Sequence, residues 1–393
     1  MGLREVPGRV IPRLDEWVFN RDRDRVVADL LRDRRYRDVP GRVAQPTRPH
    51  LVVVPQAWGS GERWQPAQGT FLFEITQSAR EILGAARVSV FEVLPDEQPA
   101  DWHTRLLTYL IDEGATHLVA QIEADPHRTA ERWTWDAFWT AASDRWLGVL
   151  LGVTFDSSWR WLAAQSRRLA RISDRFMLID ICMPMDGKLV RGRREVGPVN
   201  MPVSQRSLDC ILDQVSGTSR DIDVSFIGAL YPDRVAALEV LADRGLSIAV
   251  NPHLPSPNPL REGVRHEASY IDYMRALARS RITVNFSRSN AGPFQQLKTR
   301  VLEAALMGAV IVTDDRDRTS RFWSPSSEFA QFRGLDDLGE VVMGLLEDKA
   351  ALQAMSTAAQ NRALTLHTAG LWAEVDRMLG ERRLMRLQCS RVP

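Results

Sequence analysis

The stretch RITVNFSRSNAGPFQQLKTRVLEAALMGAVIVTDD, residues 281–315, determines the fold class of this chain. Residues 281–287 form a run of β-branched and aromatic side chains, and a loop rich in small residues follows it. Apolar residues then recur at helical spacing over 297–305, and Gly308 stands where a glycine with positive φ ends a helix. We predict a strand, a helix that begins near Gln295, and a second strand, which is the repeating unit of a parallel α/β sheet.

The same alternation of short apolar runs and helical segments is present from about residue 50 onward. The predicted strands are residues 49–56, 87–94, 116–123, 146–156, 174–181, 222–230, 246–251, 281–287 and 309–315. Between the fifth and the sixth strand, residues 187–205 are rich in Gly, Pro and charged side chains, so we predict a linker there. The sequence therefore predicts an α/β protein with two Rossmann-like, doubly wound domains that face a central cleft.

The length of 393 residues is too great for one compact core, which also favours two domains. We predict an Arg/Asp-rich arm at 1–45, a first domain at 46–205, a second domain at 206–370, and a C-terminal helix at 371–393 that packs back on the first domain. Ligands of open α/β sheets bind at the carboxyl ends of the strands, so the cleft between the domains is the predicted site.

The charges of the chain nearly cancel, with 51 Lys and Arg against 50 Asp and Glu and a net charge of +1. This balance argues against nucleic acid or an anionic membrane as a partner. The alternative is that the Arg-rich arm binds nucleic acid, but its interleaved Asp residues favour a solvated helix with internal ion pairs. The 3 cysteines lack paired spacing and no apolar run is as long as a membrane span, so we expect a cytoplasmic protein without a transmembrane segment, disulfide framework or zinc site.

Cationic side chains gather near the predicted helix start. Lysine is rare in this chain, so Lys298 at that place is notable. Lys298, Arg300 and the backbone N–H groups of a helix N-terminus together suit a diphosphate. Glu303, one turn further on, can accept hydrogen bonds from sugar hydroxyls. The alternative is that Arg300 and Glu303 form an i, i+3 pair on the surface of an ordinary amphipathic helix.

The segment QLKTRVLEAALMGAVIVTDD (296–315) resembles the donor-site signature of group 1 glycosyltransferases, and most closely that of the branch similar to the spore maturation protein CgeB. Four more segments resemble that branch in the same order: IDVSFIGALYPDR (222–234), YIDYMRALARSRITVNFSRS (270–289), FWSPSSEFAQFRGLDDLGEVVMGLLED (322–348) and NRALTLHTAGLWAEVDRML (361–379). The resemblance is good over 197–380, thin over 147–196 and absent before that. It implies the GT-B fold, in which two Rossmann-like domains face a cleft.

The resemblance also implies roles for single residues. Glu303 matches the second glutamate of the E-x7-E pattern of retaining enzymes, which holds the ribose of the donor. The first glutamate of that pattern, beside the donor sugar, falls on Gln295, and this departure removes a negative charge. Lys298 matches the stretch that meets the diphosphate, and Lys298 and Gln295 are the predicted catalytic residues. The predicted donor-binding residues are Gly228, Arg234, Ser287, Gln296, Leu297, Lys298, Arg300 and Glu303. For Arg234, a solvent-facing helix start is the alternative.

Other candidates carry weaker signals. Asp156 and His253 follow strand ends and are the predicted acceptor-side residues, although a helix cap and a polar loop residue are the alternatives. Asp221 and Asp223 form a D-x-D string, but a strand begins beside them and we predict a structural role. For His367 we predict capping or packing. The tryptophans at helical spacing favour core packing over a sugar-stacking platform; they are Trp133, Trp135, Trp139 and Trp146.

We therefore expect a glycosyltransferase that moves a sugar from a nucleotide-sugar donor to an acceptor, with retention and without a metal or cofactor. Two alternatives stay open. A nucleotide-sugar epimerase of the same fold would need carboxylates and a histidine around the sugar. A non-catalytic, glycosyltransferase-like binding protein is favoured by the glutamine at Gln295.

Overall fold

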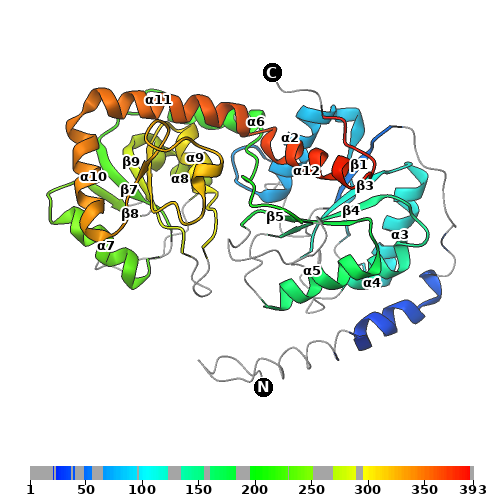
Figure 1. Cartoon of the computed structure of the whole chain (residues 1–393). Helices are drawn as coiled ribbons and strands as arrows, with labels where there is room; N and C mark the ends of the chain where they lie inside the picture. Colours follow the sequence, from blue (N-terminus) through cyan, green and yellow to red (C-terminus); the bar gives the residue numbers. More distant parts are fainter. Residues whose placement is uncertain are drawn as a thin grey trace.

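The computed structural model contains two parallel α/β domains and a helix pair that joins them (Figure 1). The structure describes residues 21, 24–36, 39, 48–54, 65–94, 97–122, 134–154, 160–182, 195–228, 230–250, 269–288 and 295–389. All pairings between the named strands are parallel. The predicted fold class, two Rossmann-like domains in tandem, is confirmed.

The sheet of the first domain has six strands in the order β2-β1-β3-β4-β5-β6. The strands are β1 (Leu51–Val54), β2 (Val88–Val90), β3 (His117–Gln121), β4 (Val149–Thr154), β5 (Phe176–Asp180) and β6 (Glu195–Val196). The helices between them are α2 (Phe71–Leu83), α3 (Pro99–Asp112), α4 (Thr134–Ala142) and α5 (Arg160–Ile172), with short 3-10 turns η1 (Arg34–Tyr36) and η3 (Ala85–Arg87). Strand β6 lies within the predicted linker 187–205, so that prediction was wrong there. A pair of residues is too short to show periodicity, and only the neighbouring strand β5 holds it in the sheet.

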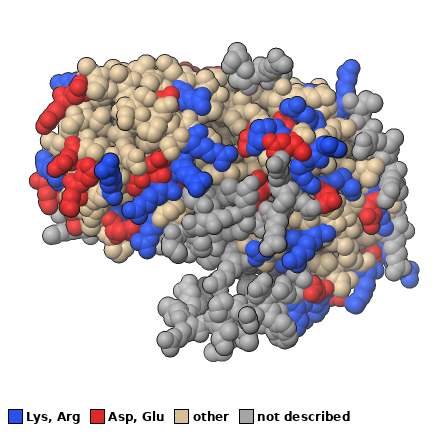
Figure 2. All heavy atoms as spheres, viewed as in Figure 1, with Lys and Arg blue, Asp and Glu red and all other residues tan. Residues whose placement is uncertain are grey.

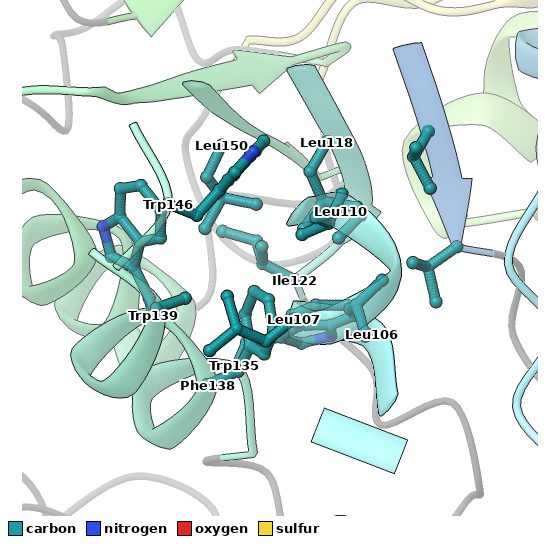
Figure 3. Packing of buried hydrophobic residues seen from close by; sticks show 14 of the residues in the cluster. Leu106, Leu107, Leu110, Leu118, Ile122, Trp135, Phe138, Trp139, Trp146 and Leu150 are labelled. Carbon is teal, nitrogen blue, oxygen red and sulfur yellow. The ribbon is translucent and has the colours of Figure 1, made fainter. Parts of the chain in front are cut away.

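Helices cover both faces of the first sheet, which explains why its strands are continuous apolar runs. The face covered by α3, α4 and α5 is packed with aromatic side chains (Figure 3). Trp135 and Trp139 are at most 1% exposed, and Trp146 donates its indole N–H to the carbonyl of Ala115 at 2.7 Å. The ring of Trp102 meets Trp135 edge to face at 5.2 Å. The core interpretation of these tryptophans is therefore confirmed, while Trp133 lies outside the described residues.

The sheet of the second domain has five strands in the order β11-β10-β9-β7-β8. The strands are β7 (Ile222–Phe226), β8 (Ile248–Val250), β9 (Ser280–Asn285), β10 (Val310–Thr313) and β11 (Ala330–Gln331). The helices are α6 (Gln205–Val215), α7 (Pro232–Ala242), α8 (Tyr270–Arg279), α9 (Arg300–Leu306), α10 (Leu335–Glu347) and α11 (Lys349–Leu366), with the turn η4 (Thr319–Arg321). Helices α6, α8, α9 and α11 pack on one face of the sheet, and α7 and α10 pack on the other.

Helix α9 ends as the sequence predicts but begins later. Gly308 has φ +71° and donates its N–H to Ala305, while Ala309 donates to Ala304 at 3.0 Å, so the two bonds close a Schellman motif. The predicted start near Gln295 was wrong, because the helix begins at Arg300. Propensity and spacing alone do not reveal that the residues before Arg300 pair with the loop after β9.

The last helix, α12 (Gly370–Glu381), lies against the first domain although it follows α11 of the second (Figure 1). Leu371, Trp372 and Val375 pack in the core between this helix, α2 and the first sheet. The indole of Trp372 donates a hydrogen bond to Ser78 on α2 at 2.9 Å. The chain therefore crosses between the domains twice, once before α6 and once after α11.

Two glutamates of α2 hold the N-terminus of α6. Glu74 is 2% exposed and accepts from the backbone N–H of Ser204 at 2.6 Å and from the hydroxyl of Ser207 at 2.5 Å. Glu81 accepts from the N–H of Gln205 at 2.9 Å. Carboxylates at a helix N-terminus are favourable because that end carries partial positive charge, so these contacts join the two domains.

The described part of the N-terminal arm forms a helix over 24–32 that leads into η1. Arg32 is bound to Asp29 within the arm, and Arg35 is bound both to Asp33 and to Asp101 on α3. Tyr36 is 3% exposed, and its hydroxyl lies 2.5 Å from Nδ1 of His103 on α3. On the face shown in Figure 2, basic and acidic side chains are interspersed over both domains.

Candidate functional site

The candidate site lies where the strand order of the second sheet reverses. The chain passes from β7 to β8 on one side and then crosses to β9 on the other, so the loops after β7 and β9 leave the sheet in opposite directions. Doubly wound sheets bind ligands at this place, outside the carboxyl ends of the strands. The loop after β7 contains Gly228, and the loop after β9 contains Ser287 and Arg288.

Gly228 leaves room for a guanidinium group. A Cβ atom at this position would clash with Nη2 of Arg300 and would lie 3.1 Å from its Cζ. Cζ of Arg300 also lies 4.9 Å from the ring centre of Phe226, within the range of a cation–π contact. The glycine and the aromatic ring together hold Arg300 against the backbone of the switch-point loop.

Arg234, the third residue of α7, brings a second guanidinium to the same ring. It is 5% exposed, and its Cζ lies 5.6 Å from the centre of Phe226 and 4.6 Å from that of Tyr231. Its Nη2 donates to the carbonyl of Arg288 at 2.7 Å. Burial lowers the pKa of Arg234, and the charge of Arg300 lowers it further. The alternative of a solvent-facing helix start is excluded by this burial.

Lys298 adds a third cation on the loop before α9. Burial lowers its pKa below the usual value, and the charges of Arg300 and Arg234 lower it further. The thiol of Cys182, just after β5 of the first domain, is near enough to act on the same pKa. Arg321 of the second domain donates to the carbonyl of Gly197 in the first at 3.2 Å. Loops at the carboxyl ends of the two sheets therefore come close to each other.

A network of neutral and acidic side chains lies beside these cations. The hydroxyl of Ser287 donates to Asp314 and accepts from the N–H of Asp317. Asp317 is fully buried, and it accepts from the side chain of Asn285 at 3.1 Å and the hydroxyl of Thr319 at 2.8 Å. Burial raises the pKa of Asp317. The sequence prediction included Ser287 but missed Asn285, the last residue of β9, and Asp317, which lies in the loop after β10.

Gln295 and Gln296 are not helical, contrary to the prediction. Gln295 forms an isolated antiparallel bridge with Arg288, and the N–H of Gln296 donates to the carbonyl of Ser287 at 2.9 Å. This pairing keeps the backbone extended and delays the helix. Leu297 is 2% exposed, so its side chain is a packing residue. The helix N-terminus therefore lies later than predicted, with Thr299 as its N-cap and Lys298 directly before it.

Glu303 lies on α9 and is 9% exposed. Its two carboxylate oxygens accept hydrogen bonds from Tyr270 at 2.8 Å and Tyr273 at 2.6 Å, both on α8. Burial raises the pKa of Glu303, although the tyrosines and Arg300 oppose this shift. The surface-pair alternative is excluded, because Glu303 is buried. Contact with a ribose stays a prediction, and each oxygen keeps a second lone pair for such a bond.

The structure describes some of the weaker candidates, and others lie outside the described residues. Asp221 pairs with Arg279, and Asp223 accepts from Ser247, both at the amino end of β7 and so at the opposite edge from the candidate site. Their predicted structural role is confirmed. His367 is 5% exposed and its Nδ1 lies 2.6 Å from the carbonyl of Val203, which confirms packing. The acceptor-side predictions lie outside the described residues; they are Asp156 and His253.

Two searches of the described residues bear on metals and membranes. No group of 3 or more His, Cys, Asp or Glu side chains in the described ranges is arranged to hold a metal ion. Within the same ranges, no helix is long and apolar enough to cross a membrane.

Comparison with known proteins adds a family match to this geometry. Residues 212–375 match the family described as "Glycosyl transferase-like". The match covers less than half of the chain and contains most of the second domain, including every cation of the candidate site. The match therefore falls on the domain that contains the candidate site. No curated protein matches the sequence.

Several solved structures match most of the chain at low sequence identity. HepE of Anabaena, in complex with UDP and glucose, is 12% identical with a TM-score of 0.49, and the match covers 85% of this chain and 100% of that one. Sucrose-phosphate synthase of Thermosynechococcus elongatus is 9% identical with a TM-score of 0.49, covering 86% and 98%. A putative UDP-N-acetylglucosamine 2-epimerase from Listeria monocytogenes is 12% identical with a TM-score of 0.45, covering 88% and 100%.

Proposed function

We propose that this protein is a glycosyltransferase that transfers a sugar from a nucleotide-sugar donor, bound by the second domain, to an acceptor bound from the side of the first. The observation that carries the proposal is the gathering of Arg234, Lys298 and Arg300 around the switch-point loop at Gly228. The family match over 212–375 supports the same function.

A diphosphate is the ligand that fits these cations best. Guanidinium groups bind phosphate oxygens through paired N–H donors, and Lys298 offers a point charge beside them. Neither Lys298 nor Arg300 forms an ion pair of 4.0 Å or less with any described residue. Burial lowers the pKa of all three cations, and neighbouring positive charges lower those of Lys298 and Arg234 further, so an anion bound among them is favourable. The backbone at Gly228 has no side chain and lets a ligand approach closely.

The reaction follows from this placement of charge. The bond between the anomeric carbon and the diphosphate oxygen breaks, a bond from the acceptor oxygen forms, and the acceptor proton passes to a leaving phosphate oxygen. Negative charge develops on the diphosphate as the bond breaks, so Arg234, Lys298 and Arg300 stabilise the transition state more than the ground state. We propose that these side chains supply this charge without a divalent metal.

The finer features are proposals of their own. Retention of configuration and membership of the CgeB-like branch follow from the resemblance of residues 296–315 and the segments around them. Gln295, in place of a carboxylate, can donate and accept hydrogen bonds beside the donor sugar but adds no charge there. Base, sugar and acceptor would be selected by loops of both domains.

A thermal-shift titration tests donor binding without knowledge of the acceptor. Wild type and Glu303→Ala are titrated with UDP, GDP, TDP, ADP and CMP and with their common sugar conjugates, in buffer with and without EDTA. A ligand that binds only the folded protein raises the melting temperature by mass action. We expect one base to shift the wild type, less so the variant, and EDTA to change nothing.

Hydrolysis of the selected donor then separates catalysis from binding. We expect slow release of the sugar, and proton NMR of the first product should show the anomeric configuration of the donor. If folded protein responds to no nucleotide, the proposal fails. If a nucleotide sugar binds but is never cleaved with any acceptor class tried, the non-catalytic alternative that Gln295 favours replaces it.

A further inference from the structure

The first domain contains a cavity at the edge of its sheet opposite to the carboxyl ends of the strands. It has a volume of about 330 Å³ and lies where α3 ends and where β3 and β4 begin. The turns just before β3 and β4, Arg175 just before β5, and residues 383–385 after α12 complete its walls. Small-molecule sites in proteins begin at about this size, and the cavity takes no part in the proposed transfer reaction.

The walls of the cavity are apolar and firmly held. Leu110, Ile111 and Val149 line it beside the ring of Trp146. Figure 3 shows Trp146 and Leu110 at the same end of the aromatic core. The indole is fixed by its bond to the carbonyl of Ala115 at 2.7 Å, and it lies over the backbone at 148, where any Cβ would collide with it. The cavity is therefore not a space that Trp146 could fill by changing its rotamer.

The chain after α12 covers one side of the cavity. Arg383 turns with φ +56°, and Leu384 and Met385 then line the cavity. Two contacts hold this segment to the sheet edge: the carbonyl of Met385 lies 2.9 Å from Nε2 of His117, and the carbonyl of Leu387 accepts from Arg87 at 2.6 Å. Hydrogen bonds of its backbone carbonyls thus hold this segment to the sheet edge. Leu384 and Met385 of the segment line the cavity.

The charged residues in the lining have one sign. Arg175 and Arg383 line the cavity, and the lining contains no Asp or Glu. Arg175 donates to the carbonyl of Ser143, which fixes the position of its guanidinium group at the rim. An apolar chamber with two guanidinium groups is complementary to a molecule that has an apolar body and a single anionic head.

We infer that this cavity is a second binding site, specific for a small aliphatic carboxylate whose chain enters the apolar chamber and whose carboxylate meets Arg175 and Arg383. The site belongs to the first domain and to the segment after α12, so it is independent of the donor site. An occupant under residues 383–385 would contact the segment that follows α12.

Sodium decanoate is the probe for this inference, titrated into the full chain by isothermal calorimetry. We expect saturable binding with one site per chain, and weaker binding of decanol, which lacks the charge. Arg383→Gln should weaken decanoate binding about three- to fivefold, as expected for a partly exposed charge pair, and leave decanol unchanged. Arg206→Gln on α6 is the matched control and should change neither.

Two filling variants test the chamber itself. Met385→Trp and Leu384→Trp place a large side chain toward the cavity and should abolish binding of both probes, and their melting temperatures show whether each has folded. Saturating nucleotide should not displace decanoate. Absence of saturable binding, equal affinity in the filled variants, or competition with nucleotide would each overturn the inference.

Discussion

The charged side chains at the two ends of the second sheet have different kinds of neighbour. At the amino end of β7, Asp221 pairs with Arg279 and Asp223 pairs with Arg281, all at least partly exposed. At the carboxyl end, Arg234 and Arg300 share the ring of Phe226. Charges at the amino end neutralise each other in solvent, whereas Arg234 and Arg300 at the carboxyl end lie beside the same aromatic ring.

The acidic side chains at the carboxyl end accept hydrogen bonds from neutral groups. Asp317 is bound by Asn285 and Thr319, and Glu303 is bound by two tyrosines, so neutral donors satisfy them. Gathering like charges in a partly buried place costs free energy unless an anion completes the site. The contrast indicates that the amino end serves stability and the carboxyl end serves binding.

The largest effect should come from Arg300→Ala at the carboxyl end. Loss of a charge-assisted contact should weaken binding of the selected nucleotide by about 10- to 100-fold, measured by calorimetry. The matched control is Arg279→Ala at the amino end, which should leave the nucleotide affinity unchanged. Equal losses of affinity in the two variants would mean that the two ends do not differ as described.

Gly228→Ala should act on the same site indirectly. The new Cβ would collide with the guanidinium of Arg300, the flexible end of a side chain, so the fold should survive while the cation moves. The backbone at Gly228 has φ +158°, which is strained for alanine, so we expect a lower melting temperature together with about tenfold weaker nucleotide binding.

Gly344→Ala on α10 is the control for this substitution. Nothing lies within 4 Å of a Cβ there, so alanine should stabilise the helix by about 0.5–1 kcal/mol and leave binding unchanged. Wild-type affinity in Gly228→Ala would show that Arg300 does not need its place against the glycine.

Glu303 should make the stability of the protein depend on pH. Burial raises its pKa in the folded state above the unfolded value, so the folded protein binds more protons between these two values. The contribution of Glu303 to the free energy of unfolding is therefore greatest below the unfolded pKa and falls as pH rises through the folded one. Urea unfolding of wild type and Glu303→Gln from pH 4 to pH 8 measures this.

The expected result is that wild type loses stability relative to Glu303→Gln as pH rises. A difference between the two proteins that is constant with pH would show that the tyrosine hydrogen bonds cancel the effect of burial. Tyr273→Phe removes one of these bonds and should make the decline steeper.

The smallest effect should come from Asp221→Asn at the amino end. The Arg279 guanidinium lowers the pKa of Asp221, so the pair stabilises the fold above the unfolded pKa and loses this contribution as pH falls through the folded one. Both side chains are largely solvated, and we expect a loss of no more than about 0.5 kcal/mol near pH 7 and none at low pH, from chemical unfolding. A loss above about 2 kcal/mol would contradict the expectation that a solvated ion pair at the amino end contributes little to stability.

Much of the fold was readable from the sequence because its strands are buried on both faces. Each of the nine predicted strands overlaps an observed one, and only the two-residue strands β6 and β11 among the described strands were not predicted. The end of α9 was also predicted correctly, since Gly308 has a single local reason to be glycine. The start of α9 was not, because the bridge between Arg288 and Gln295 joins residues whose pairing no local pattern encodes.

The candidate site was readable in part. Gly228, Arg234, Lys298 and Arg300 were named from position and resemblance. The contact of both Arg234 and Arg300 with the ring of Phe226 was not predicted. The roles assigned to Gln295 and Glu303 stay predictions. Asn285 and Asp317 were missed, since a polar residue at the end of a strand or in the loop beyond it is common, and only its neighbours in space indicate a role.

The sequence by itself determined the class of fold. Burial on both faces of a parallel sheet requires repeated apolar runs, and these are visible in the sequence. It also determined which residue types were available for chemistry, above all a lysine and arginines near Gly228. Only the tertiary structure decided how these charges are held. Packing around Phe226, the tyrosines that bind Glu303 and the return of α12 to the first domain join residues far apart in the chain, and such contacts depend on geometry that no local pattern contains.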